Sequence, residues 1–242
     1  MPKEQSKPRA ATVRPAGHPE AFNAKGSMRS VPSRSRLDAI RHISEPRLQR
    51  YLATTANDED AALDLYEWNT SVSGAFFESI SALEIALRNA LHERLSMWCA
   101  NDAGSWYDDP KGVFNEPTKR AIASARARVA SKGARETPGR VVAEISFGFW
   151  RYLLTGAYQA PLWVPCLHHA FPGAKRVDIE MQVAALHELR NRIAHHEAIY
   201  HRDLERDYDY LVELAEHLHS RLGWWIDSRS RVPQVLRERP TA

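Results

Sequence analysis

The chain has 242 residues, of which 43% are hydrophobic and 26% are charged, enough apolar material for one sizeable core or two small ones. It has no run of 18 apolar residues and no apolar segment near its start, which argues against a transmembrane helix and a secretory signal. Two cysteines, Cys99 and Cys166, exclude a disulfide framework, so we expect a cytoplasmic protein without a membrane partner.

The formal net charge of +3 hides an uneven distribution of charge along the chain. Residues 1–36 carry eight basic side chains against two acidic ones, and residues 118–140 carry seven against one. Each block is either a solvated surface or an electrostatic footprint for nucleic acid. The sequence leaves both interpretations open.

The two ends of the chain differ in composition from the rest. Residues 1–36 are rich in Pro, Ser, Gly and Ala and lack apolar periodicity, so we expect a disordered basic tail. Residues 227–242 are similar and predict a flexible C-terminal tail. Residues 37–226 would then form one folded domain, in which we find no internal repeat.

Within this domain, apolar side chains recur every three or four residues, which is typical of helices. Ser44-Glu45-Pro46 predicts one helix start, and Asp58 predicts the next. The helix that Asp58 opens carries Ala61, Leu65 and Trp68 on one face. The longest apolar stripe follows it, and it comprises Phe76, Ile80, Leu83, Leu87, Leu91, Leu95 and Trp98.

The remaining elements follow the same periodicity. Residues 101–117 contain Gly, Asp and Pro and predict a loop, and a basic helix over about 118–131 follows. Apolar patterns over 141–154 and 203–222 predict further helices, with others between them. Because no segment alternates as a strand would, the sequence predicts an all-α bundle of about six to eight helices.

Chemically active side chains gather near the end of one predicted helix. Two arginines, an asparagine, two histidines and a glutamate lie within eight positions: Arg190, Asn191, Arg192, His195, His196 and Glu197. Basic groups at a helix C-terminus can simply interact with the helix dipole. However, an imidazole transfers protons near neutral pH, and a guanidinium matches two phosphate oxygens. Together they suit attack of a ribose 2′-hydroxyl on its phosphodiester, a reaction that requires RNA and no metal.

The spacing of this cluster sets a condition on the site. Arg190 and His195 are five residues apart, about 140° around a regular helix, so they would not converge on one phosphate. Either the helix ends near Ile193, or a second copy of the chain completes the site across a two-fold axis.

Four segments in this order resemble the Abi-like (abortive infection) proteins of the HEPN superfamily. They are residues 65–69, 83–91, 146–153 and 190–197. The last of them contains Arg190-Asn191-Arg192-Ile193-Ala194-His195, which is similar to the R-x4-6-H motif of that superfamily. The resemblance covers about residues 37–222, and it departs from the family at Ala198, where proline is usual.

The resemblance implies a HEPN-like helical bundle, a homodimer with facing motifs, and a metal-independent endoribonuclease of antiviral defence or toxin–antitoxin systems. Carried over, Arg190 would bind phosphate, His195 would be catalytic and Asn191 would orient the site. Five residues would support them, namely Arg192, His196, Glu197, Glu84 and Arg88. The implied partners are RNA and an antitoxin RNA or protein, and no cofactor or metal is implied.

Two alternatives remain from the residues themselves. A non-catalytic RNA-binding module, regulated by an antitoxin RNA or protein, would use the two basic blocks for affinity. A metal hydrolase would use His187, His195, His196 and His201, but these do not form an HExxH motif. Trp224 and Trp225 are expected to be dimer contacts.

Overall fold

The computed structural model describes residues 33–241. The predicted N-terminal tail therefore lies outside the described residues, except for residues 33–36, which form the start of a helix. Among the described residues, no helix is both long enough and apolar enough to cross a bilayer.

The prediction of an all-helical fold is confirmed for this part of the chain, which contains no strand. Its α-helices are α1 (Ser33–Thr54), α2 (Glu59–Trp98), α3 (Glu116–Ser131), α4 (Pro138–Glu144), α5 (Phe147–Leu153), α6 (Arg176–Ala194), α7 (Leu204–Leu218), α8 (Ser220–Arg229) and α9 (Val232–Arg237). Short helical turns at Trp106–Asp108, Gly156–Tyr158, Gln159–Trp163 and Leu167–Ala170 connect some of them.

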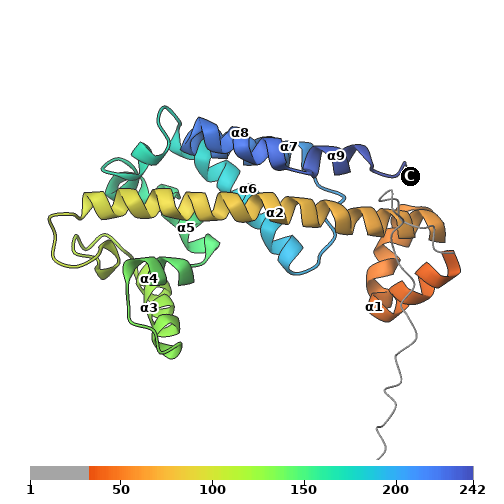
Figure 1. Cartoon of the computed structure of the whole chain (residues 1–242), viewed down its shortest axis with the longest axis horizontal. Coiled ribbons are helices and arrows are strands. Elements are labelled where there is room, and N and C mark those ends of the chain that lie inside the picture. Colours follow the sequence, from red (N-terminus) through yellow and green to blue (C-terminus); the bar gives the residue numbers. More distant parts are fainter. Residues whose placement is uncertain (1–32, 242) are drawn as a thin grey trace, which may run out of the picture.

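Helix α2 is the element on which the others pack. It has 40 residues, which corresponds to a length of about 60 Å, and Figure 1 shows it running through the folded part. Asp58 caps it as predicted, because its Oδ1 accepts a hydrogen bond from the Ala61 amide at 3.0 Å. The predicted apolar stripe is buried from Phe76 to Leu95, with Leu83, Leu87 and Leu91 completely inaccessible to solvent, and Trp98 is half-buried.

Helices α1, α5, α6, α7 and α9 contact α2 directly, whereas α8 packs on α7 and α3 packs on α4. Helices α7, α8 and α9 lie along one side of it, α3 and α4 lie on the other, and α6 crosses it (Figure 1). α1 packs against the N-terminal part of α2. This arrangement brings the C-terminal end of α6 close to α1, where Arg47 Nη1 donates a hydrogen bond to the His196 carbonyl at 3.0 Å.

Three predicted helix boundaries are wrong. The segment predicted over 141–154 contains two helices, α4 and α5, which are separated at Ile145 and Ser146. α1 runs from Ser33 through Pro46 without a new start at Ser44. The helix predicted over 203–222 is broken at His219, whose backbone is extended, so that α8 folds back against α7. Gly223 makes this contact possible, since a Cβ at that position would overlap the Glu216 side chain.

The predicted flexible tail at 227–242 is also wrong for the described residues up to 241. α8 continues to Arg229, and the short helix α9 packs on α2 with Val232 and Val235 buried. The indole Nε1 of Trp68 donates a buried hydrogen bond to the Val235 carbonyl at 2.7 Å. The folded part therefore extends beyond residue 226.

We predict that Val232→Ala lowers the free energy of unfolding by about 2 kcal/mol, because it removes apolar surface from a fully buried position. Denaturant unfolding of the full chain measures this change. Gln234→Ala, an exposed position on the same helix, should change it by less than about 0.5 kcal/mol. Equal, negligible effects of the two substitutions would mean that α9 is not packed in solution.

Candidate functional site

The predicted cluster lies where α6 ends. His195 is the last residue of helical character, and His196 adopts a left-handed backbone conformation with φ of 55°. The Glu197 amide donates to the Arg192 carbonyl at 2.8 Å, and the His196 amide donates to the Ile193 carbonyl at 2.9 Å. These two bonds form the Schellman pattern that closes helices, here with histidine where glycine is usual. The helix thus ends near Ile193, as one of the two expected alternatives had it, but His195 keeps its helical position because its amide donates to the Asn191 carbonyl at 2.9 Å.

A cleft of about 1150 Å³ opens between this helix end, α1 and the N-terminal half of α2. Both His195 and His196 are exposed and line it together with Arg190. Ile193, Ala194, Glu197 and Ala198 complete the side formed by the end of α6 and the following turn. α1 and α2 supply the facing walls, which consist of Pro46, Arg47, Arg50, Tyr51, Tyr66, Asn69, Thr70, Ser73, Gly74 and Phe77. The cleft therefore combines guanidinium, imidazole and aromatic groups around one open space.

Arg190 faces a carboxylate from α2. Its Nε lies 3.5 Å from Glu84 Oε2 and makes no hydrogen bond within the described part of the chain, and its side chain remains 35% exposed. Among the described residues Glu84 pairs with Arg190 rather than with Arg88, the partner suggested by their i,i+4 spacing. Glu84 is therefore placed to orient the Arg190 guanidinium beside the cleft.

Asn191 and Arg192 lie on the other side of the helix end, around a second hollow of about 410 Å³ that His195 also borders. Arg192 is held by two carboxylates, Glu188 at 3.1 Å and Glu197 at 3.3 Å. The structure therefore brings Arg190, His195 and His196 to one cleft and separates Asn191 and Arg192 from it.

His187, on the preceding turns of α6, is half-buried in this second hollow. Its Nε2 lies 3.3 Å from Asn191 Nδ2, and its Nδ1 accepts a weak hydrogen bond from Arg151 Nη1 at 3.4 Å. Burial, followed by the positive charges of Arg151 and Arg190, lowers the pKa of His187 below its usual value. The neutral imidazole is the form that the folded protein favours.

The loop that follows α6 is anchored by two residues that sequence reasoning missed. Asn69, buried on α2, accepts hydrogen bonds through its Oδ1 from the amides of Ile199 at 2.8 Å and Tyr200 at 3.1 Å. Asn69 is a polar residue within an apolar helix stripe, and this position in the sequence could have indicated its anchoring role.

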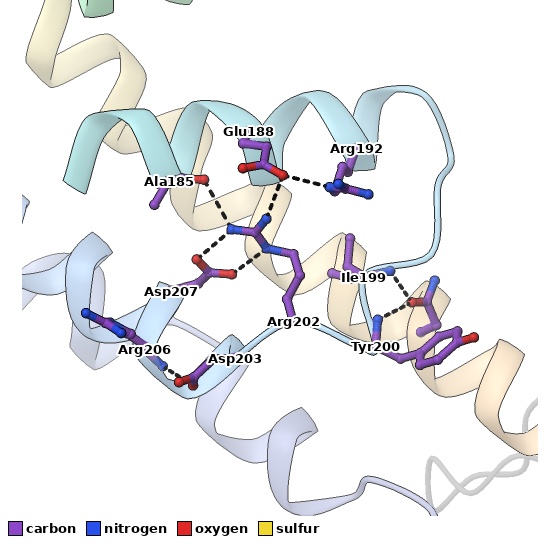
Figure 2. Close-up of polar contacts among 10 residues, drawn as sticks. Ala185, Glu188, Arg192, Ile199, Tyr200, Arg202, Asp203, Arg206 and Asp207 are labelled. Carbon is purple, nitrogen blue, oxygen red and sulfur yellow. Dashed lines mark hydrogen bonds and ion pairs between the residues drawn. The ribbon is translucent and has the colours of Figure 1, made fainter. Parts of the chain in front are cut away.

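Arg202 is the second anchor, and Figure 2 shows it between α6 and α7. Its guanidinium pairs with the buried Asp207 at 2.8 Å and with Glu188 at 3.1 Å, and Nη2 lies 3.5 Å from the Ala185 carbonyl. Asn69 and Arg202 thus hold both halves of the loop that begins at the candidate site.

Four of the seven basic side chains in the block at 118–140 are paired with carboxylates. Arg126 pairs with Asp108 and Glu136, while Arg128 and Lys132 both contact Glu144. Lys119 lies 3.6 Å from Asp109. This pairing favours the solvated-surface interpretation of the block over the nucleic-acid footprint.

Within the described part of the chain, no three His, Cys, Asp or Glu side chains are grouped so as to hold a metal ion. No protein-family model matches the chain, and neither curated proteins nor solved structures include one with significant similarity to it. The resemblance to Abi-like proteins therefore depends on the four sequence segments.

We predict that Asn69→Ala destabilises the protein by about 2–4 kcal/mol, because it leaves the buried Ile199 amide and the half-buried Tyr200 amide without their acceptor. Asn69→Asp keeps an acceptor oxygen at this position and should retain more of the stability. Thermal and denaturant unfolding measure both variants. An Asn69→Ala protein as stable as the wild type would show that this contact does not hold the loop.

Because the pKa of His187 is lowered in the folded protein, the free energy of unfolding should depend on pH. As the pH falls below about 6.5, the unfolded chain takes up a proton on this ring more readily than the folded chain, so the free energy of unfolding decreases. His187→Gln removes this contribution. We expect a smaller loss of stability between pH 7.5 and pH 5.5 in the variant, measured by denaturant unfolding, and an unchanged loss would contradict the assignment.

Proposed function

We propose that this chain is a metal-independent endoribonuclease that cleaves RNA through attack of the ribose 2′-hydroxyl. The observation that carries the proposal is that Arg190 and His195, identified in the sequence as an R-x4-H pair, line the same open cleft. The resemblance to Abi-like HEPN proteins supports the same chemistry. We further propose a toxin-like role in phage defence, in the cytoplasm, held silent by an antitoxin RNA or protein.

In this proposal His195 accepts the proton of the 2′-hydroxyl, and the oxygen attacks the adjacent phosphorus. The phosphorus–5′-oxygen bond breaks, and the 5′-oxygen takes up a proton from a protonated imidazole, for which His196 is available in the same cleft. Arg190 stabilises the negative charge that develops on the phosphate oxygens, and Glu84 orients it. The products are a 2′,3′-cyclic phosphate and a 5′-hydroxyl end.

We propose that the protein acts as a homodimer, as the resemblance implies. Two large apolar side chains, Trp224 and Trp225, are 69% and 44% exposed on α8, and exposed apolar patches commonly mark contacts between proteins. Facing copies would place two arginine–histidine pairs near one RNA strand.

A non-catalytic RNA-binding module is the second candidate. It is favoured by one observation, namely that α1 adds the guanidinium groups of Arg47 and Arg50 to the cleft that contains Arg190. Such a cleft would attract a phosphate backbone whether or not the RNA is cut.

The test is incubation of the purified full chain with single-stranded RNA in the presence of EDTA. We predict that His195→Ala and Arg190→Ala each reduce cleavage by about 100-fold or more while keeping the wild-type circular dichroism and oligomeric mass. His201→Ala is the matched control, since His201 is exposed and lines neither hollow, and it should cleave like the wild type.

The readout is a denaturing gel with analysis of the RNA ends. A substrate with 2′-deoxyribose at the cut position should remain intact, because it lacks the nucleophile. Cleavage that persists in both variants would overturn the assignment of the catalytic pair. RNA that is retained by the protein but recovered intact would favour the binding module instead.

A further inference from the structure

The wall of the cleft that faces the end of α6 is formed by one face of α2. Thr70, Ser73, Gly74 and Phe77 are spaced three or four residues apart and therefore share this face. Phe77 is 46% exposed, although the neighbouring Phe76 is fully buried in the core. The helix thus presents an aromatic ring to the open space beside Arg190 and His195.

Gly74, one turn before Phe77, has no structural explanation within the fold. It lies in the interior of a 40-residue helix, where glycine costs about 1 kcal/mol relative to alanine. A Cβ at this position would meet no atom within 4 Å, so close packing does not require glycine, and its φ is not in the left-handed region. What glycine does provide is an open floor in the cleft, next to the Phe77 ring.

The charges around this floor are complementary to a polyanion. The opposite wall carries the guanidinium groups of Arg47 and Arg50 on α1, and the end of α6 carries Arg190 and two histidines. Among the residues whose side chains the structure describes, Glu197 is the one acidic residue that lines the cleft, and its carboxylate is paired with Arg192. Basic groups that follow a phosphate backbone, together with an exposed ring, are typical of single-strand binding.

From this geometry we infer that the cleft binds single-stranded RNA with an unpaired base stacked on Phe77 above Gly74. The guanidinium group of Arg50 holds a flanking phosphate, whereas that of Arg47 donates to the His196 carbonyl and supports the wall. A paired base cannot occupy this place, because its faces are covered by its neighbours in the duplex. The inference rests on the proposed function, since it assigns the substrate class to the same cleft and makes Phe77 and Gly74 determinants of specificity.

Binding of an RNA that cannot be cleaved tests the inference separately from catalysis. The probe is a 12-nucleotide 2′-O-methyl RNA that contains 2-aminopurine, whose fluorescence is quenched when the base stacks. We expect wild-type protein to quench it and to bind it more tightly than the same strand in a duplex. Phe77→Ala should weaken binding about tenfold and abolish the quenching.

The matched control is Ile85→Ala, because Ile85 lies on the same helix, is 48% exposed and does not line the cleft. It should bind like the wild type. Gly74→Leu provides a second variant that is expected to fold, since leucine is a better helix former and its Cβ starts in open space. It should weaken binding by about tenfold while its thermal midpoint stays equal to or above that of the wild type.

The outcomes separate the two proposals. Unchanged binding by Phe77→Ala, or equal affinity for single strand and duplex, would overturn the stacking inference even if the protein cleaves RNA. A change in oligomeric mass on Phe77→Ala, measured by light scattering, would assign the ring to a subunit contact and overturn it as well. If the protein quenches the probe but leaves natural RNA intact, the stacking inference is supported and the proposed endoribonuclease activity is overturned.

Discussion

The geometry of the candidate site depends on how α6 ends. His195 still occupies a helical position, since its amide donates to the Asn191 carbonyl at 2.9 Å, so it lies about 140° around the axis from Arg190. Both residues nevertheless line the larger cleft, together with the residues of the turn that follows. The left-handed backbone of His196 stops the helix directly after His195. Arg47 then binds the His196 carbonyl from α1, so the turn joins the helix end to the wall that faces it. A histidine in this conformation is less favourable than glycine, so the surrounding contacts must hold it.

The distribution of charge illustrates why a basic segment in a sequence is not a basic surface. Arg126 and Lys132 belong to the most basic stretch of the folded part, yet both are paired with carboxylates that come from neighbouring segments. The cleft, in contrast, collects arginines from α1 and α6, which are far apart in the sequence. This grouping of arginines therefore arises from the packing of these helices and is not visible in any sequence window.

Periodicity predicted the fold well because it reports directly on burial. The stripe from Phe76 to Leu95 was recognisable since each member points to the core, and Asp58 was recognisable as a cap from its position alone. Helix α9 was missed because its six residues are too few to show a period and are flanked by charged side chains. The anchoring role of Asn69 was missed for another reason, namely that its partners lie 130 residues away. The motif in the sequence led to the grouping of Arg190 with His195. The position of Phe77 and Gly74 in the same cleft depends on the packing of α2 beside α6, which no sequence pattern indicates.

The residues of the motif line two different hollows, and this arrangement constrains how the proposed chemistry would proceed. Arg190 borders the larger cleft, Asn191 borders the smaller hollow, and His195 borders both. An RNA strand held along the larger cleft would therefore bring a phosphodiester to His195, which borders both hollows. The His195 imidazole is exposed to solvent at this position, so water can reach it between turnovers. Asn191 and the neutral His187 would then contact the strand beyond the cut, a role that differs from that of the arginine beside them in the sequence.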